Sequence, residues 1–244
     1  MKLEGRIAIV TGGTSGMGAA AARGLAAEGA RVVVAGRNAD RGEAVASEIG
    51  GVFQPTDVTR VADCRTLAQR ALGEFGRIDV LVNCAGIFPL GAVTEVTEDE
   101  FDDAWRANVK GTFFCGQSVI PQMLEQGSGK IVNFTSVAGL AGVAGGSVYC
   151  TTKGAIVTMT KAWAVELAPK GLNVNAIAPG TVETPMNEAL RDDPGFDAMT
   201  RAATPQGRNG RVEDIVPLVV FLAGDDARWM NGSIVAVDGG WLAT

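Results

Sequence analysis

Short runs of apolar residues alternate along this chain with longer stretches in which apolar positions recur at helical spacing. The first run, Ile7-Ala8-Ile9-Val10, shows no polar alternation, which is typical of a parallel strand buried on both faces. The pattern predicts strands over residues 7–11, 32–35, 52–54, 80–83, 130–135, 173–178 and 234–237. Between them it predicts helices over residues 17–28, 40–49, 61–75, 98–126, 148–168 and 212–223.

Regular alternation of strand and helix predicts an α/β fold of the doubly wound Rossmann type, with helices on both faces of a parallel sheet. The 244 residues contain no linker, repeat or low-complexity block, so we expect one domain over residues 1–244. The one long irregular stretch, residues 181–211, contains three prolines. A loop of that length in a compact domain is usually functional, and we expect a lid over the substrate.

Composition excludes several classes of function. Histidine is absent, which rules out Ser-His-Asp and Cys-His catalysis and any histidine-ligated metal, so we expect no metal site. The net charge of −6 argues against nucleic acid or an anionic membrane as a partner. The four cysteines lack metal-ligand spacing and fit reduced thiols. With no signal-peptide pattern and no membrane-span pattern, we expect a cytoplasmic protein.

A glycine-rich turn follows the first predicted strand and opens an alanine-rich helix. It reads Thr-Gly-Gly-Thr-Ser-Gly-Met-Gly over residues 11–18, with the spacing G-x-x-x-G-x-G rather than the commoner G-x-G-x-x-G. Glycines let the backbone approach an anion, and the start of the helix offers free N–H groups, so the turn suits a pyrophosphate. The candidate contacts are Gly12, Thr14, Ser15, Gly16, Met17 and Gly18.

The end of the second predicted strand bears on the choice of dinucleotide. NAD sites carry a carboxylate there for the ribose 2′-hydroxyl, whereas NADP sites carry a basic residue for the 2′-phosphate. Here Gly36 is followed by Arg37 and Asn38, and no acid is present. We therefore expect NADP(H) to be preferred, with NAD(H) possible. In the alternative interpretation, Arg37 is an ordinary solvated arginine.

Tyr149, the only tyrosine, lies four residues before Lys153 in a predicted helix, so both share one face. A neighbouring ammonium group lowers the pKa of a phenol from about 10, which makes tyrosine usable as a general acid and base. Ser136 follows the fifth predicted strand, at the sheet edge where doubly wound folds bind ligands. Because the Tyr-x-x-x-Lys spacing is common by chance, it indicates catalysis only in combination with Ser136.

Together these pieces resemble the compact, one-domain branch of the short-chain dehydrogenase/reductase family. Within it the chain is similar to 3-oxoacyl-(acyl-carrier-protein) reductases and related ketone reductases. One departure is Cys84, where asparagine is usual. The resemblance implies a seven-stranded sheet of order 3-2-1-4-5-6-7 and a homotetramer. It is carried by residues 11–18, Asp57-Val58, Asn-Cys-Ala-Gly at residues 83–86, Asn108, Ser136, Tyr149-x-x-x-Lys153, and Pro-Gly-Thr-Val-Glu-Thr at residues 179–184.

The resemblance also implies roles for the catalytic residues. Tyr149 would exchange the proton with the substrate oxygen, and Lys153 would lower the pKa of the tyrosine and bind the nicotinamide ribose. Ser136 would hold the substrate carbonyl, and Asn108 would anchor a water that passes protons onward. A modest apolar substrate pocket is expected from Phe88, Ala138, Val143, Met186 and Leu190.

For the cofactor, the resemblance implies that Asp57 accepts a hydrogen bond from the adenine amine and that Val58 flanks the ring. The other implied cofactor contacts are Asn83, Ala85, Gly86, Pro179, Gly180, Val182 and Thr184.

The sequence therefore predicts an oxidoreductase that transfers a hydride between NADP(H), or NAD(H), and a ketone or secondary alcohol. A 3-oxoacyl-(acyl-carrier-protein) reductase is the alternative, although residues 124–130, where such reductases cluster basic residues, contain only Lys130. A dinucleotide-sensing protein without catalysis is a remote alternative, because a binder does not need Asn108, Ser136, Tyr149 and Lys153 together. A sugar-nucleotide epimerase or dehydratase usually needs a further substrate domain.

Overall fold

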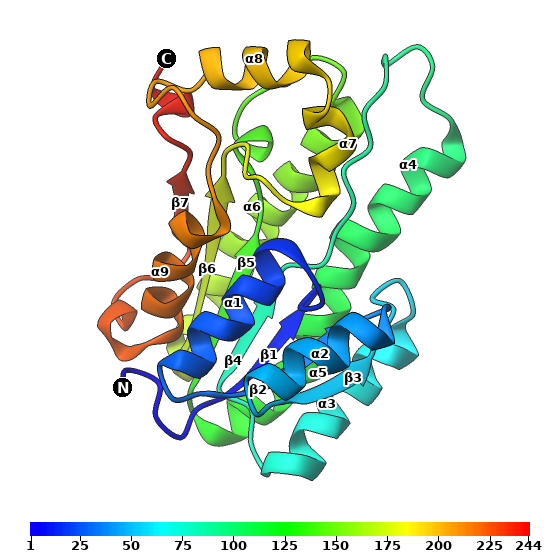
Figure 1. Ribbon diagram of the computed structural model, residues 1–244. Helices are drawn as coiled ribbons and strands as arrows, with labels where there is room; N and C mark the ends of the chain where they lie inside the picture. Colours follow the sequence, from blue (N-terminus) through cyan, green and yellow to red (C-terminus); the bar gives the residue numbers. More distant parts are fainter.

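A computed structural model describes residues 1–244 and contains one parallel sheet of seven strands, in the order β3-β2-β1-β4-β5-β6-β7 (Figure 1). The predicted fold class and strand order are thus confirmed. All the strands end at one edge, with Thr11 level with Ala35 on one side and Asn83 on the other. The strands are β1 (Ile7–Thr11), β2 (Arg31–Gly36), β3 (Val52–Pro55), β4 (Val80–Asn83), β5 (Gly129–Phe134), β6 (Leu172–Pro179) and β7 (Ile234–Val237).

Helices cover both faces of the sheet (Figure 1). One face packs against α1 (Gly16–Ala27), α2 (Ala39–Glu48) and α9 (Val212–Ala223), and the other against α3 (Val61–Phe75), α5 (Gly111–Gln126) and α6 (Ser147–Leu167). Ala8 and Val10 of β1 enter the first core and Ile9 enters the second. Because successive side chains all meet a core, the strands read as unbroken apolar runs.

The helix predicted over residues 98–126 is continuous, but it changes from α-helical to π-helical hydrogen bonding and back. It begins as α4 (Glu98–Ala104), passes through a π-helical segment (Trp105–Lys110) and continues as α5. A capping box starts it: Thr97 Oγ1 accepts from Glu100 N at 3.2 Å, and Glu100 Oε2 accepts from Thr97 N at 2.9 Å. The π-helical segment contains Asn108, and such segments often mark functional sites.

The stretch expected to be irregular, residues 181–211, contains two helices, so that expectation needs correction. They are α7 (Glu188–Arg191) and α8 (Pro194–Ala202), at the end of the molecule toward which the strands run (Figure 1). Asp193 caps α8 by accepting from Gly195 N at 2.8 Å, and Pro194 suits the first helical position. Both helices are too short, and too close to prolines, to give a clear sequence pattern.

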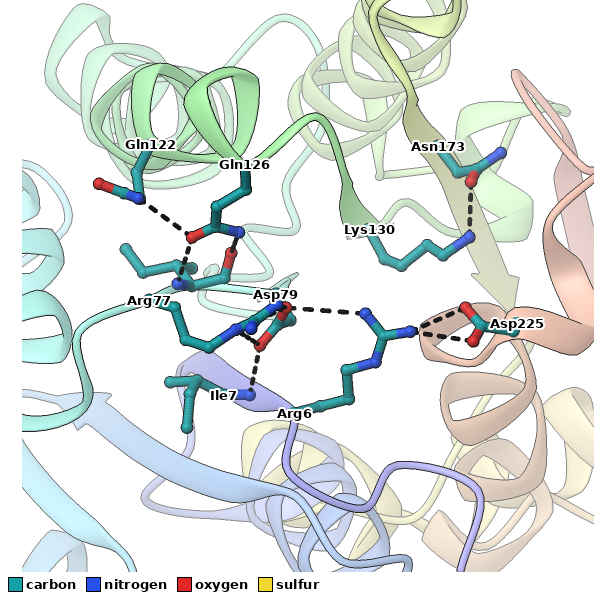
Figure 2. Close-up of polar contacts among 10 residues, drawn as sticks. Arg6, Ile7, Arg77, Asp79, Gln122, Gln126, Lys130, Asn173 and Asp225 are labelled. Atoms are coloured by element: carbon teal, nitrogen blue, oxygen red, sulfur yellow. Dashed lines mark hydrogen bonds and ion pairs between the residues drawn. The ribbon is translucent and has the colours of Figure 1, made fainter.

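The opposite edge of the sheet is held by a polar network (Figure 2). Asp79, buried before β4, accepts hydrogen bonds from Ile7 N at 2.9 Å and Arg77 Nη2 at 2.6 Å. Its carboxylate also lies 3.6 Å from Arg6, which binds Asp225 at 2.9 Å. These contacts fix the starts of β1 and β4, at the edge of the sheet opposite the one where the strands end.

Candidate active site

A groove of about 460 Å³ runs along the loops that follow β1, β2, β3 and β4. Predicted site residues that line it are Gly12, Thr14, Ser15, Gly16, Met17, Gly18, Arg37, Asn38, Asp57, Val58, Ala85, Gly86, Thr184 and Met186. Residues of the groove that sequence analysis missed are Arg41, Thr56, Thr59, Ile87, Ala107 and Pro185. Cys84, noted only as a departure from the family pattern, also lines it.

The glycine turn can approach a dinucleotide closely because its glycines have no side chains. Its backbone also packs directly against the loop after β4. Gly12 has a φ of 68°, and a Cβ there would lie 2.9 Å from the N and Cα atoms of Ala85. Thr11 Oγ1 fastens that loop by accepting from Cys84 N at 3.2 Å. Ser15 caps α1 without a side-chain hydrogen bond, so the first N–H groups of the helix are available to an anion.

Two arginines line the groove beyond β2. The side chains of Arg37 and Arg41 make no ion pair, whereas Arg23 and Arg77 are bound to carboxylates. Asn38 starts α2 by accepting from Arg41 N at 2.9 Å, which places Arg41 in the first helical turn. The predicted start of α2, residue 40, is one residue later than the observed start at Ala39. The signal that sequence analysis could have used is the presence of a second arginine only four residues after Arg37.

The four predicted catalytic residues come from three elements and meet at one end of the groove. Tyr149 and Lys153 lie on α6, Ser136 follows β5, and Asn108 lies in the π-helical segment. Gly86 connects them to the groove, because a Cβ there would lie 2.8 Å from Asn108 Oδ1 and 3.8 Å from Lys153 Nζ. The structure therefore brings all four into one neighbourhood.

Hydrogen bonds fix Asn108 in place. Its Oδ1 accepts from Ile87 N at 2.7 Å, and its Nδ2 donates to Ile87 O and to Thr152 Oγ1, both at 3.0 Å. Thr112 Oγ1 donates to its backbone carbonyl at 2.7 Å. Thr152 in turn donates to Tyr149 O at 2.9 Å, so Asn108 ties the loop after β4 to the turn of α6 that carries the tyrosine.

The pKa of Tyr149 shifts in the direction opposite to the sequence expectation. Burial raises the pKa of Tyr149 to about 12, against a smaller lowering by its hydrogen bond with Ser136. Burial lowers the pKa of Lys153 to about 8. The expected lowering of the tyrosine pKa by Lys153 is absent, because Lys153 Nζ donates to Phe134 O at 2.8 Å and lies 5.6 Å from the tyrosine ring centroid.

The five predicted substrate-pocket residues differ in burial and in their contacts with the catalytic residues. The ring of Phe88 packs edge-on against that of Tyr149, with centroids 4.6 Å apart and planes at 74°. Ala138 is buried, and its N–H donates to Ser136 Oγ at 3.2 Å. Val143 is half-buried in the loop before α6, and Leu190 is half-buried in α7. Only Met186 of this set lines the groove itself.

Besides Tyr149 and Lys153, four predicted cofactor residues do not line the groove. Asn83 is buried within the sheet, where its Nδ2 donates to Asn133 Oδ1 of β5 at 3.0 Å, so its side chain does not line the groove. Pro179 ends β6, and its carbonyl accepts from Ser136 Oγ at 3.5 Å. Val182 is buried, and Gly180 lines a separate hollow beside Asp238.

Two further properties bear on the site. The structure contains no group of three or more acidic or cysteine side chains arranged to hold a metal ion. None of its helices combines the length and apolar character needed to cross a membrane.

Comparison with known proteins agrees with this geometry. Residues 12–242 match a family described as enoyl-(acyl carrier protein) reductase. The chain is 36% identical to a 3-oxoacyl-(acyl-carrier-protein) reductase of Thermotoga maritima, over 98% of this chain and 99% of that protein. It is 37% identical to a D-threitol dehydrogenase of Mycolicibacterium smegmatis, over 98% and 94% of the two chains.

A solved structure extends the comparison to the cofactor. A gluconate 5-dehydrogenase of Burkholderia cenocepacia, in complex with NADP and tartrate, superposes with a TM-score of 0.96 at 33% identity, covering 100% of this chain and 97% of that one. The chain belongs to the short-chain dehydrogenase/reductase family of oxidoreductases, whose members include proteins named for alcohol and ketone substrates.

Proposed function

We propose that this protein transfers a hydride between NADP(H) and a small ketone or secondary alcohol, with Tyr149 as the acid and base. The observation that carries the proposal is the meeting of Tyr149, Lys153, Ser136 and Asn108 at one end of a groove built around a glycine turn. A protein that only sensed a dinucleotide would not need an ordered tyrosine, serine and lysine at that point.

The residues present fit a nicotinamide dinucleotide, which supplies the hydride when bound. The bare turn at Gly12 and the free N–H groups of α1 would hold the pyrophosphate, and Asp57 and Val58 would flank the adenine. Asp57 Oδ1 already accepts from Thr59 N at 3.0 Å, which leaves its second oxygen for the adenine amine. Thr184 would contact the nicotinamide end.

Side chains of the protein would donate the proton to the substrate oxygen and then replace it. Tyr149 is fully protonated at neutral pH, since its pKa is about 12, and it can donate its hydroxyl proton to a carbonyl oxygen. Ser136, hydrogen-bonded to the same phenol, would hold that oxygen. Lys153 would supply the replacement proton, and Asn108 would anchor the water that passes protons onward, since the side chains of both residues lie beside Gly86.

NADP(H) is the proposed preference, with NAD(H) as the weaker cofactor. The unpaired Arg37 and Arg41 on the groove support a 2′-phosphate, and no carboxylate stands at Gly36. The NADP named for the gluconate dehydrogenase structure supports the same choice.

A reductase of carrier-bound 3-oxoacyl groups is the second candidate, favoured by the identity to the Thermotoga maritima protein. The basic residues expected to dock a carrier are Lys130 and Lys170. Lys130 lies at the start of β5 and Lys170 lies just before β6, so both are at the edge of the sheet opposite Tyr149. We therefore favour a free ketone.

We also propose one catalytic domain with a lid over residues 181–211, in a cytoplasmic homotetramer. Four free cysteines agree with a reducing compartment. Exposed aromatic side chains on the long helix and beyond α9 support subunit contacts: Trp105 is 39% exposed and Trp229 is 97% exposed. Light scattering coupled to size-exclusion chromatography measures the assembly, and a monomer at micromolar concentration contradicts it.

The function is tested by following oxidation of NADPH by the purified protein over a panel of ketones that includes a 3-oxoacyl thioester. We expect turnover with at least one free ketone, and loss of that turnover in Tyr149→Phe. Binding of NADPH without turnover of any ketone or alcohol would contradict the proposal.

A further inference from the structure

A second hollow, of about 240 Å³, adjoins the candidate active site. Ser147 and Val148 line it and directly precede Tyr149, while Pro89 lines it and directly follows Phe88. Since the rings of Phe88 and Tyr149 are in contact, the hollow begins next to both members of the aromatic pair. Its full lining is Pro89, Leu90, Gly91, Glu95, Val96, Glu100, Gly145, Ser147 and Val148.

The two loops that form this hollow are fastened to each other. Gly91 N donates to Gly145 O at 2.8 Å, which joins the segment after β4 to the segment before α6. The capping box of Thr97 and Glu100 fixes the third wall, the start of α4. The hollow is therefore a formed feature beside the reacting centre.

Exposed apolar side chains gather around the same end of the molecule. Leu90 is 40% exposed, Leu140 43% and Met186 51%. They lie on three loops that follow β4, β5 and β6, at the edge of the sheet that also carries Ser136. Exposed apolar groups gathered from separate loops are typical of a ligand-binding surface.

The charged residues that line the hollow are all acidic. Glu95 and Glu100 line it, and no lysine or arginine does. The carboxylate of Glu95 has no ion-pair or hydrogen-bond partner, and hydrogen bonds from Thr97 hold the pKa of Glu100 below its usual value. Residues 88–103 contain six acids and no base.

None of the four arginines of the lid, Arg191, Arg201, Arg208 and Arg211, lines the hollow. Arg201 pairs with Asp197 at 2.8 Å and Arg208 with Asp214 at 2.7 Å. Arg191 hydrogen-bonds only to Asn187 Oδ1, at 3.3 Å, and Arg211 makes no ion pair. A negatively charged group that enters the hollow nevertheless meets the carboxylates of Glu95 and Glu100 and no lysine or arginine of its lining.

We propose that this hollow receives the part of the substrate remote from the carbonyl, and that the substrates are uncharged or cationic apolar ketones rather than carboxylates or other anions. The inference rests on the proposed function and specifies its substrate class. Apolar contact with Leu90, Val96 and Val148 would hold the remote group, and Glu95 and Glu100 would repel an anion.

The test compares two ketones that differ in charge. Ethyl 5-oxohexanoate and 5-oxohexanoate share the same methyl ketone, and kcat/KM with saturating NADPH is measured for each at low and high salt. We expect the ester to be favoured by at least about tenfold at low ionic strength, since like-charge repulsion changes association rates by about 10 to 10³. Added salt should shrink the ratio, because it screens the carboxylates.

Glu95→Lys should raise the ratio of acid to ester turnover by at least about tenfold. Glu166→Lys is the matched control, because Glu166 is an exposed acid near the far end of α6, about 25 Å along the helix from Tyr149. That control should leave the ratio as it is in the native chain.

Equal kcat/KM for ester and acid, or a ratio that Glu95→Lys and Glu166→Lys change alike, would overturn the subsite while leaving the oxidoreductase function intact. Failure to reduce either ketone, or any other ketone in the panel, would overturn both proposals.

Discussion

Thr14 fills the space that any side chain at Gly36 would need. A Cβ at position 36 would lie 2.6 Å from Thr14 Cγ2 and 3.2 Å from its Oγ1. Gly36 ends β2, where NAD-binding folds carry the carboxylate that receives the ribose 2′-hydroxyl. The turn after β1 thus excludes that carboxylate, and the cations that line this part of the groove are Arg37 and Arg41.

Arg37→Ala and Arg41→Ala should each lower kcat/KM for NADPH by about ten- to a hundredfold, because a charge-assisted contact to phosphate is worth roughly 1.5–3 kcal/mol. The same variants should change kcat/KM for NADH little, since NADH lacks the 2′-phosphate. Arg65→Ala, at an exposed arginine of α3 without an ion pair, is the control. Equal losses with the two cofactors would mean that the arginines stabilise the fold instead.

Gly36→Asp alone should weaken binding of both cofactors, because the new side chain meets Thr14. Adding Thr14→Ala removes the Cγ2 and Oγ1 atoms that obstruct it, and the double variant should gain activity with NADH relative to the single variant. Cofactor titration by quenching of protein fluorescence measures both affinities. If Gly36→Asp by itself already improves NADH binding, Thr14 does not restrict position 36.

Tyr149→Phe should lower kcat by at least about 10²-fold, the low end for loss of a general acid. The phenylalanine ring keeps the edge-on contact with Phe88, so the fold and the affinity for NADPH should be retained. Steady-state kinetics and a thermal melt of the same preparation separate the two effects. Near-normal turnover in this variant would remove Tyr149 from its proposed role.

Burial of Lys153 makes stability depend on pH. The unfolded chain keeps the lysine proton up to about pH 10.5, whereas the folded chain releases it near pH 8. Between these values the unfolded state binds more protons, so stability rises with pH across this window. A shift of that size corresponds to a gain of about 3 kcal/mol at the upper end.

Lys153→Met should lack this rise, so the stability of the native chain relative to the variant should increase between pH 8 and 10.5. Urea unfolding at several pH values measures the difference. Tyr149, with its raised pKa, is present in both proteins and cancels in the comparison. Parallel pH profiles for the two proteins would show that Lys153 stays protonated in the folded chain.

The sheet could be predicted because its signals are local. Each strand is an unbroken apolar run, and the glycine turn after β1 is read directly from the sequence. The spacing of Tyr149 and Lys153 correctly put them on one helix. The direction of the tyrosine pKa shift could not be read in the same way, because burial by distant residues decides it.

Other features depend on contacts between distant parts of the chain. Asn83 turns into the sheet because Asn133, fifty residues later, lies beside it on β5. Arg41 lines the groove because the first turn of α2 borders it together with the loop after β2, and no apolar pattern marks that placement. The hollow beside Glu95 forms only where the loops before α4 and α6 meet, and no local pattern marks that meeting.

The placement of basic residues distinguishes a free ketone from a carrier-bound one as substrate. Acyl carrier protein is strongly acidic, so a reductase that docks it needs cations near the active site. The only base in residues 124–130 is Lys130, whose Nζ donates to Asn173 Oδ1 at 2.6 Å at the edge of the sheet opposite Tyr149 (Figure 2). Lys170 lies at the same far edge, before β6.

With a net charge of −6 and six acids in residues 88–103, this chain should repel an acidic carrier rather than steer it. We expect kcat/KM at low salt for a carrier-bound 3-oxoacyl group to be no higher than for the same group as a short free thioester, and to rise for the carrier-bound form as salt screens the repulsion. A carrier-bound form that is strongly favoured at low salt, and loses its advantage as salt is added, would contradict this and establish carrier-bound 3-oxoacyl groups as the substrate.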